Sequence, residues 1–103
     1  MSTHTPEKLI QHFLKNWDIT PANYYLNAVS ENSSYAQCLS RPSDETIKEI
    51  VEAGPTFGFA ITVTEPAEAK TGLKLTFLWD NLEETEEAMA SVGLIEKEPA
   101  GAN

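Results

Sequence analysis

Apolar residues recur near the start of the chain at the three- and four-residue spacing of a helix. They form one stripe over residues 6–17, which predicts a helix with one face in a core. Thr5 and Pro6 have the residue types that favour a helix start. The stripe consists of Leu9, Ile10, Phe13, Leu14 and Trp17.

A second helical pattern covers residues 44–53, and Ser43 or Asp44 is suited to cap its N-terminus. Its apolar side holds Ile47, Ile50 and Val51. Gly54 is expected to supply the left-handed residue that follows a helix, and Pro55 to prevent its continuation.

From Thr56 the apolar period changes from helical spacing to strict alternation, which predicts a strand. The alternation resumes after the turn-rich segment 66–72, so we expect an antiparallel hairpin. One face of it is apolar, and the other is mostly small or polar. The apolar positions are Phe57, Phe59, Ile61 and Val63, then Leu73, Leu75, Phe77 and Trp79.

Residues 18–41 contain two short aromatic runs, 23–29 and 34–39, on either side of a turn-like segment. We favour a β-hairpin here. The alternative is a helix over residues 21–30, followed by a loop and one strand. The favoured order is α-ββ-α-ββ-α, an α+β fold with an antiparallel sheet of three to four strands and helices packed on one face.

The last helix is expected to begin after Asp80 or Asn81, to cover residues of about 82–92 and to end at Gly93. Its buried stripe would be Leu82, Thr85, Met89 and Val92, and its solvated face Glu83, Glu84, Glu86 and Glu87. Residues 1–95 would then form a single domain, with a frayed tail over 96–103.

The 103 residues carry a formal net charge of −9, and its distribution is uneven. Acids and bases balance over residues 1–43, so residues 44–103 carry the whole excess. Such a field repels nucleic acid and anionic membrane and favours a protein partner with a basic surface. Solubility is the alternative interpretation of the same charge.

The residues at the start lack a basic region and an apolar region of the kind found in signal peptides. Apolar stretches are far shorter than the roughly 20 residues of a membrane span. Cys38 is the single cysteine, so the chain cannot form an internal disulfide. Together these features favour a cytoplasmic location.

No catalytic, metal or cofactor motif stands out in the sequence. The two histidines are His4, near the terminus, and His12, beside the first apolar stripe, where a structural role is expected. Cys38 suits a small buried hydrophobic position, although Arg41 is near enough in sequence to activate a thiol. We therefore expect no cofactor, no metal and no enzymatic activity.

Residues 45–93 resemble in their pattern of helix, hairpin and short acidic helix the leader segments of nitrile-hydratase-type peptide precursors. That resemblance implies a chain whose C-terminal end is modified. However, the residues after Gly93 include no Cys, Ser or Thr to accept a modification, so a precursor role is not expected.

The leading hypothesis is a non-enzymatic protein-binding module, such as an inhibitor, an immunity-type protein or a regulatory partner. One of two adjacent tyrosines in a strand must be exposed. The expected partner-binding residues are Glu83, Glu84, Glu86, Glu87, Tyr24 and Tyr25. One alternative is a mimic of nucleic acid.

The other alternative is a small-ligand-binding or enzymatic domain, in which oligomerisation completes a cleft. One wall of that cleft would be Gly58, Ala60, Thr62, Thr76 and Leu78, where Gly58 and Ala60 leave a flat patch.

Overall fold

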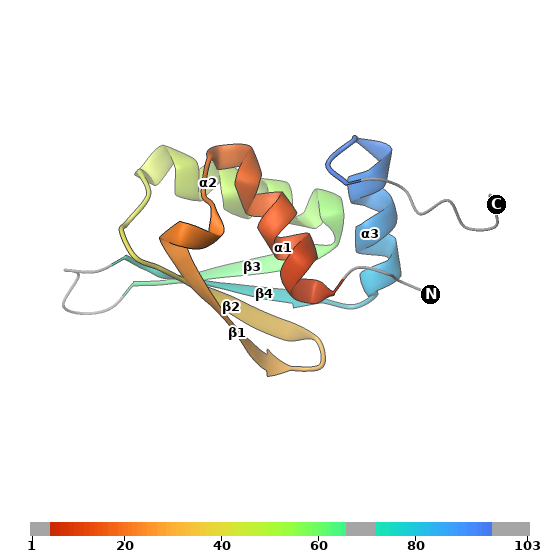
Figure 1. The fold of residues 1–103 in the computed structure, drawn as a ribbon, viewed down its shortest axis with the longest axis horizontal. Helices are drawn as coiled ribbons and strands as arrows, with labels where there is room; N and C mark the ends of the chain where they lie inside the picture. The colour runs from red at the N-terminus through yellow and green to blue at the C-terminus, as the bar shows by residue number, and fades with distance from the viewer. Residues whose placement is uncertain (1–4, 66–71, 96–103) are drawn as a thin grey trace.

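The computed structural model describes residues 5–65 and 72–95, and it has the α-ββ-α-ββ-α order that the sequence predicts (Figure 1). The helices are α1 (Pro6–Leu14), α2 (Asp44–Ala53) and α3 (Leu82–Ser91). The strands are β1 (Tyr24–Ser30), β2 (Ser33–Cys38), β3 (Phe59–Thr64) and β4 (Lys74–Trp79). Three short 3₁₀ segments are η1 (Lys15–Trp17), η2 (Pro21–Asn23) and η3 (Gly54–Phe57).

The four strands form one antiparallel sheet in the order β1-β2-β4-β3. The favoured hairpin in residues 18–41 is confirmed, and the alternative helix over 21–30 is wrong. The two hairpins are joined by β2 and β4, which pair from Ser33 with Leu78 to Gln37 with Lys74. Of the predicted turn at 66–72, residues 66–71 lie outside the described part of the chain.

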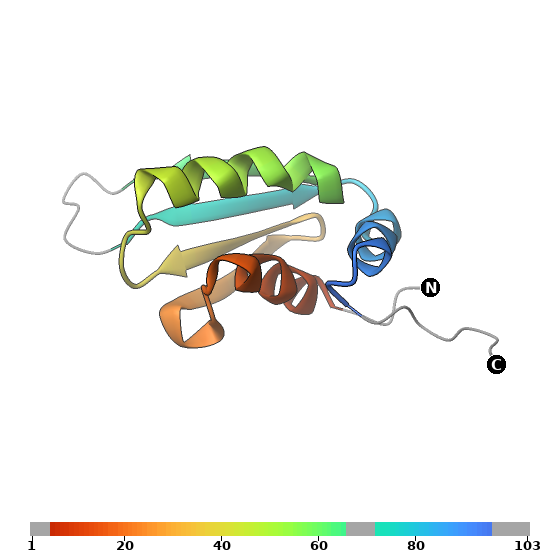
Figure 2. The same cartoon turned by 90° about the horizontal axis from the view of Figure 1, so that it is seen from above.

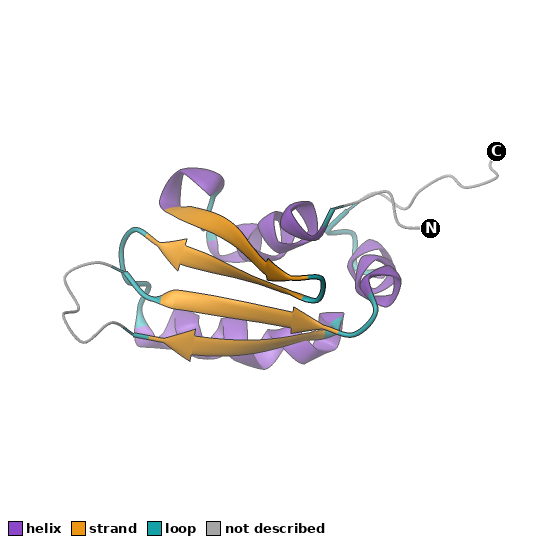
Figure 3. Cartoon of the chain, turned by 90° about the horizontal axis from the view of Figure 1, so that it is seen from below, coloured by secondary structure: helices purple, strands orange, loops and turns teal. Residues whose placement is uncertain are grey.

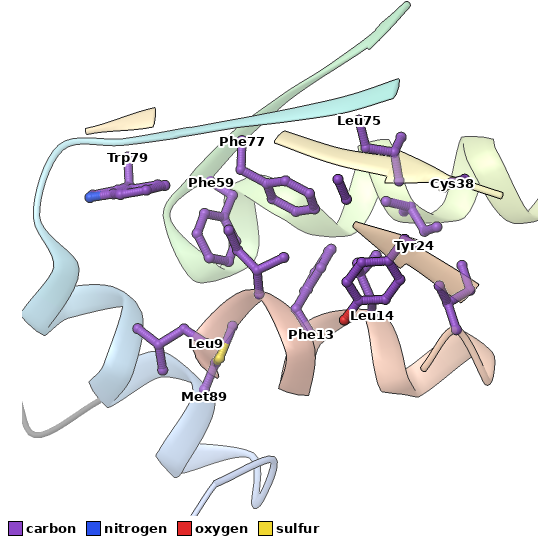
Figure 4. Close-up of a cluster of buried hydrophobic side chains, with 14 of the residues drawn as sticks. Leu9, Phe13, Leu14, Tyr24, Cys38, Phe59, Leu75, Phe77, Trp79 and Met89 are labelled. Carbon is purple, nitrogen blue, oxygen red and sulfur yellow. The ribbon is translucent and has the colours of Figure 1, made fainter. Parts of the chain in front are cut away.

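Helices α1 and α2 lie side by side over one face of the sheet, and α3 lies beside one end of it (Figures 1 and 2). The core between these layers is an aromatic cluster centred on Phe13 of α1 (Figure 4). The Phe13 ring meets four others edge to face, with centroid distances from 5.1 to 5.9 Å. Those partners are Trp17, Phe57, Phe59 and Phe77. This burial supplies the main driving force for the fold.

Both predicted N-caps of the first two helices are confirmed. The side chain of Thr5 accepts a hydrogen bond from the Lys8 backbone N–H, and Ser43 accepts one from Thr46. The first helix ends earlier than predicted as an α-helix, because its last turn tightens into η1.

The prediction for Gly54 is wrong. Gly54 has right-handed helical angles, φ −51° and ψ −52°, and the chain continues through Pro55 into η3. Proline fits there because its fixed φ suits the first turn of a helical segment. The left-handed residue is Gly58, with φ 82°, so β3 begins only at Phe59. Gly54 is small for another reason, since a Cβ atom there would lie 2.7 Å from Ile61 Cδ1.

Helix α3 begins as predicted, because Asn81 accepts hydrogen bonds from the backbone N–H groups of Glu83 and Glu84. Thr85 and Met89 are fully buried. Val92 is 58% exposed, which contradicts its place in the predicted buried stripe. The helix ends one residue before Val92, so the periodic face no longer applies to it. The predicted frayed tail, 96–103, lies outside the described residues.

Candidate functional site

The acidic side of α3 is the first predicted partner-binding surface. Glu83, Glu84 and Glu87 are exposed, Glu86 is half-buried, and the helix contains no Lys or Arg. Carboxylates in the first turn are stabilised by the helix dipole, which accounts for Glu83 and Glu84. Glu87 lies beyond that turn, so helix stability alone does not explain it.

The position of this acidic helix is fixed by a contact between α3 and the turn before β3. Gly58 lies against Thr85, and a Cβ atom at Gly58 would come within 2.8 Å of Thr85 Oγ1. Glycine at position 58 therefore allows both the left-handed backbone of this turn and the close approach of Thr85. It precedes β3 and is therefore not a strand residue as predicted, although it lies beside Ala60 and Leu78 of the predicted patch.

The adjacent tyrosines of β1 point to opposite faces of the sheet, as expected. Tyr25 is 63% exposed, whereas Tyr24 is only 4% exposed and lies in the core beside Leu14 and Cys38 (Figure 4). The prediction that Tyr24 binds a partner is therefore wrong, because alternation in β1 directs it inward. Its hydroxyl oxygen is buried without a hydrogen-bond partner. Burial, with the nearby Cys38, raises the pKa of Tyr24 to about 12.

The exposed tyrosine and the acidic helix do not form one surface. Tyr25 shares a row with Gln37 and Lys74, the residue that begins β4, whereas α3 follows Trp79 at the other end of that strand. Five strand steps separate these ends by about 17 Å. The residues predicted as one site thus belong to two surfaces.

The second surface is the sheet face that none of the described helices covers (Figure 3). Its register places residues in rows across all four strands, of which the central row is Asn27, Tyr35, Thr76 and Thr62. The four strands contain no Asp or Glu, and Lys74 is their one charged residue. Its ammonium nitrogen lies 4.7 Å from the centre of the Tyr35 ring, within the range of a cation–π interaction. We call this surface the open sheet face.

Sequence reasoning assigned a cleft wall to part of this face and missed its electrostatic character. A signal was present, because both alternating runs of residues 56–79 lack acids while the segments that flank them are rich in acids. What could not be seen is that β2 pairs with β4 and brings the first hairpin, whose strands also lack acids, into the same surface.

Two hollows mark the described surface. One, of about 90 Å³, lies at the end of the open sheet face and is lined by Gly58, Ala60, Leu78, Trp79 and Asp80. Small-molecule sites usually enclose about 300 Å³ or more, so these residues alone do not form the predicted cleft. The other, of about 350 Å³, lies between α1 and η2 and is lined by Gln11, His12, Lys15, Thr20 and Pro21. It is shallow and open to solvent.

The remaining candidates for chemistry are buried or scattered. Cys38 is 2% exposed, as its predicted hydrophobic role requires, and burial raises the pKa of its thiol. A raised pKa disfavours the nucleophilic thiolate. Within residues 5–65 and 72–95, no three His, Cys, Asp or Glu side chains are grouped so that they could hold a metal ion.

A small ionic network ties the end of β3 to the start of α2. Arg41 Nε donates to Glu65 Oε2 at 2.7 Å, and its Nη2 donates to Asp44 Oδ1 at 2.6 Å. The hydrogen bond from Arg41 holds the pKa of Glu65 below its usual value. These side chains are largely in solvent, so the network is expected to contribute little to stability.

Comparison with known proteins gives no assignment. No protein-family model matches the sequence, and neither curated proteins nor solved structures show a significant match. Among the described residues, no helix is long and apolar enough to cross a membrane.

Proposed function

We propose that this chain is a non-enzymatic protein-binding module that engages a basic partner through the exposed carboxylates of α3. The observation that carries the proposal is the exposed row of Glu83, Glu84 and Glu87 on a helix without a basic residue. Unlike charges across an interface steer association and select among partners. Asp80 precedes the helix and extends the same field.

The anchoring of α3 supports a surface role for this side. The helix buries Thr85 and Met89, and Leu82 is partly buried, so its fold requires only one narrow stripe. Ala90 also packs against the core, whereas Glu84 and Glu87 remain exposed to a partner. The helix dipole accounts for the acids of the first turn but not for Glu87. Binding to a basic partner would explain the additional negative charge of Glu87.

The nucleic-acid mimic is a weaker account of the same helix. Its ten residues span about 15 Å, which is less than half of the roughly 34 Å helical turn of DNA. A row this short would imitate only a few phosphates. A compact basic patch on a protein fits its size better.

The test compares two variants with equal changes in net charge. One is Glu84→Gln with Glu87→Gln on α3, and the control is Glu45→Gln with Glu52→Gln on α2. All four carboxylates are exposed. Each variant and the wild type would be immobilised and used to capture proteins from an extract of the native host at low and high salt.

We expect basic proteins to bind the wild type and the α2 control, to be lost from the α3 variant, and to elute as salt screens the charges. Equal retention by all three baits would show that α3 is not the binding surface. Retention that resists salt would contradict an electrostatic interface.

A further inference from the structure

The two edges of the sheet differ in how they are protected. At β1 the register shifts between Ala28 and Ser30, and this bulge interrupts the edge. At β3 the pairing with β4 is regular from Phe59 to Thr64, and the strand contains no charge and no proline. Natural proteins usually protect an open edge with a bulge, a charged residue or a proline. Without such protection, the unpaired N–H and C=O groups of the edge can pair with another strand.

We propose that β3 pairs antiparallel with β3 of a second copy of this chain, so that the two sheets join into one of eight strands. No described strand occupies the outer side of β3. The proposal concerns the outer side of β3 and not the acidic row of α3, so it does not depend on the function proposed for that helix.

Charge favours a second copy as the occupant. The helix that packs above β3 is α2 (Figures 2 and 3), and its carboxylates at 45, 49 and 52 recur on one side at helical spacing. That side lies toward η1, the segment that follows α1, because Glu49 Oε1 accepts a hydrogen bond from Trp17 Nε1 at 3.0 Å. Ile47 and Val51 lie on the opposite side of the helix by the same spacing.

The side of α2 that carries Ile47 and Val51 would let two acidic chains meet without opposing carboxylates. Asp44, at the start of α2, is already paired with Arg41. Contact between copies through the acidic side of α2 or through α3 would bring like charges together. β3 contains no acid to attract a basic peptide, and Glu65, which follows it, is already paired with Arg41.

The strand sequence is complementary to itself. With Thr62 at the two-fold axis, Thr62 faces Thr62 of the partner on the open sheet face, and Ile61 faces the partner's Val63 on the helix side. Pairs of β-branched side chains and Thr–Thr pairs stabilise antiparallel strands. Ile61 and Val63 are only partly buried in one chain, although they point toward the core layer. Pairing would complete their burial.

Sedimentation equilibrium of the full chain would test the proposal. We expect the mass to rise from 11.4 kDa toward twice that value as concentration increases from about 1 µM to about 1 mM, the range of weak to moderate association. Thr62→Lys should raise the dimer Kd about fivefold, because it places like charges directly opposite each other.

Asn27→Lys is the matched control, since Asn27 occupies the same row of the same face at the β1 edge. Both residues are exposed, so neither change should disturb the folded monomer. An equimolar mixture of Thr62→Lys and Thr62→Glu should associate more tightly than either variant alone. A wild type that stays monomeric, an equal effect of Asn27→Lys, or a mixture that fails to associate would each overturn the proposal.

Discussion

The two faces of this sheet are made of alternate residues of the same four strands, yet they differ in nearly every property. On the covered face Phe77 and Leu75 are fully buried under α1 and α2. On the open face Leu78 is 44% exposed and Thr62 is in solvent. Among the described residues, the acids lie on the helices and in the segments that connect the elements, and none lies in a strand.

This difference shows that the net charge of a small domain need not be spread over its surface. A helix can place carboxylates in water while its other side packs, as α2 does with Glu45 outside and Ile50 in the core. The four strands carry no charged residue on their open face except Lys74. The described part of the molecule therefore has two different surfaces, an acidic one on α3 and one on the sheet whose single charged residue is Lys74.

The largest expected effect comes from comparing substitutions at two neighbouring residues of β4. Phe77→Ala should lower the free energy of unfolding by about 3–5 kcal/mol, because it leaves a cavity beside Phe13 and Phe59. Thr76→Ala, on the open face, should change it by no more than about 0.5 kcal/mol. Urea denaturation measures both.

If Phe77→Ala does not fold, Phe77→Leu supplies a milder change at the same position and should still cost more than Thr76→Ala. Similar costs on the two faces would mean that the open face is covered in solution.

The adjacent tyrosines of β1 provide a test of intermediate size. Tyr24→Phe removes a buried hydroxyl without a hydrogen-bond partner and should raise the free energy of unfolding by about 1 kcal/mol. Tyr25→Phe should leave the free energy of unfolding nearly unchanged, since the Tyr25 side chain is exposed on the open sheet face.

The same pair has a pH signature. The folded pKa of Tyr24 is raised from 10.0 to about 12, so between these values the unfolded chain loses the proton first and stability falls as pH rises. Tyr24→Phe should remove that part of the alkaline decline in denaturation curves, and Tyr25→Phe should not. An equal decline in wild type and Tyr24→Phe would show that Tyr24 ionises freely in the folded state.

Much of the fold could be predicted because local patterns agree with the tertiary structure. Residues 44–53 form the predicted helix, since the Ser43 cap and the isoleucine spacing are local signals. The strand alternation likewise identified the buried side of β3 and β4. The glycines were misassigned because two glycines follow α2 within five residues. Which of them is left-handed depends on packing against Ile61 and Thr85.

The candidate site was only partly predictable for a related reason. Exposure of the acidic side of α3 follows from helical spacing, and three of its four glutamates are exposed. Which of Tyr24 and Tyr25 faces the core depends on the register of β1 with β2, and alternation alone leaves that choice open. The open sheet face and the regular β3 edge required the order of strands from distant segments, which no local pattern contains.

The smallest expected effect concerns Glu65, which follows β3 and whose carboxylate is paired with Arg41. The hydrogen bond from Arg41 lowers the folded pKa of Glu65 from the usual 4.5. A lowered pKa means that the pair contributes stability above that usual value and loses it as pH falls through the folded value. A double-mutant cycle of Arg41→Gln and Glu65→Gln would measure the coupling by urea denaturation at neutral and acid pH.

The cycle should give a small coupling at neutral pH and none once Glu65 is protonated. Because both side chains are exposed to solvent, added salt should reduce the neutral value as well. A coupling that persists in acid would assign the effect to packing of the Arg41 side chain. In that case the charge of the Glu65 carboxylate would contribute nothing to the stability of the fold.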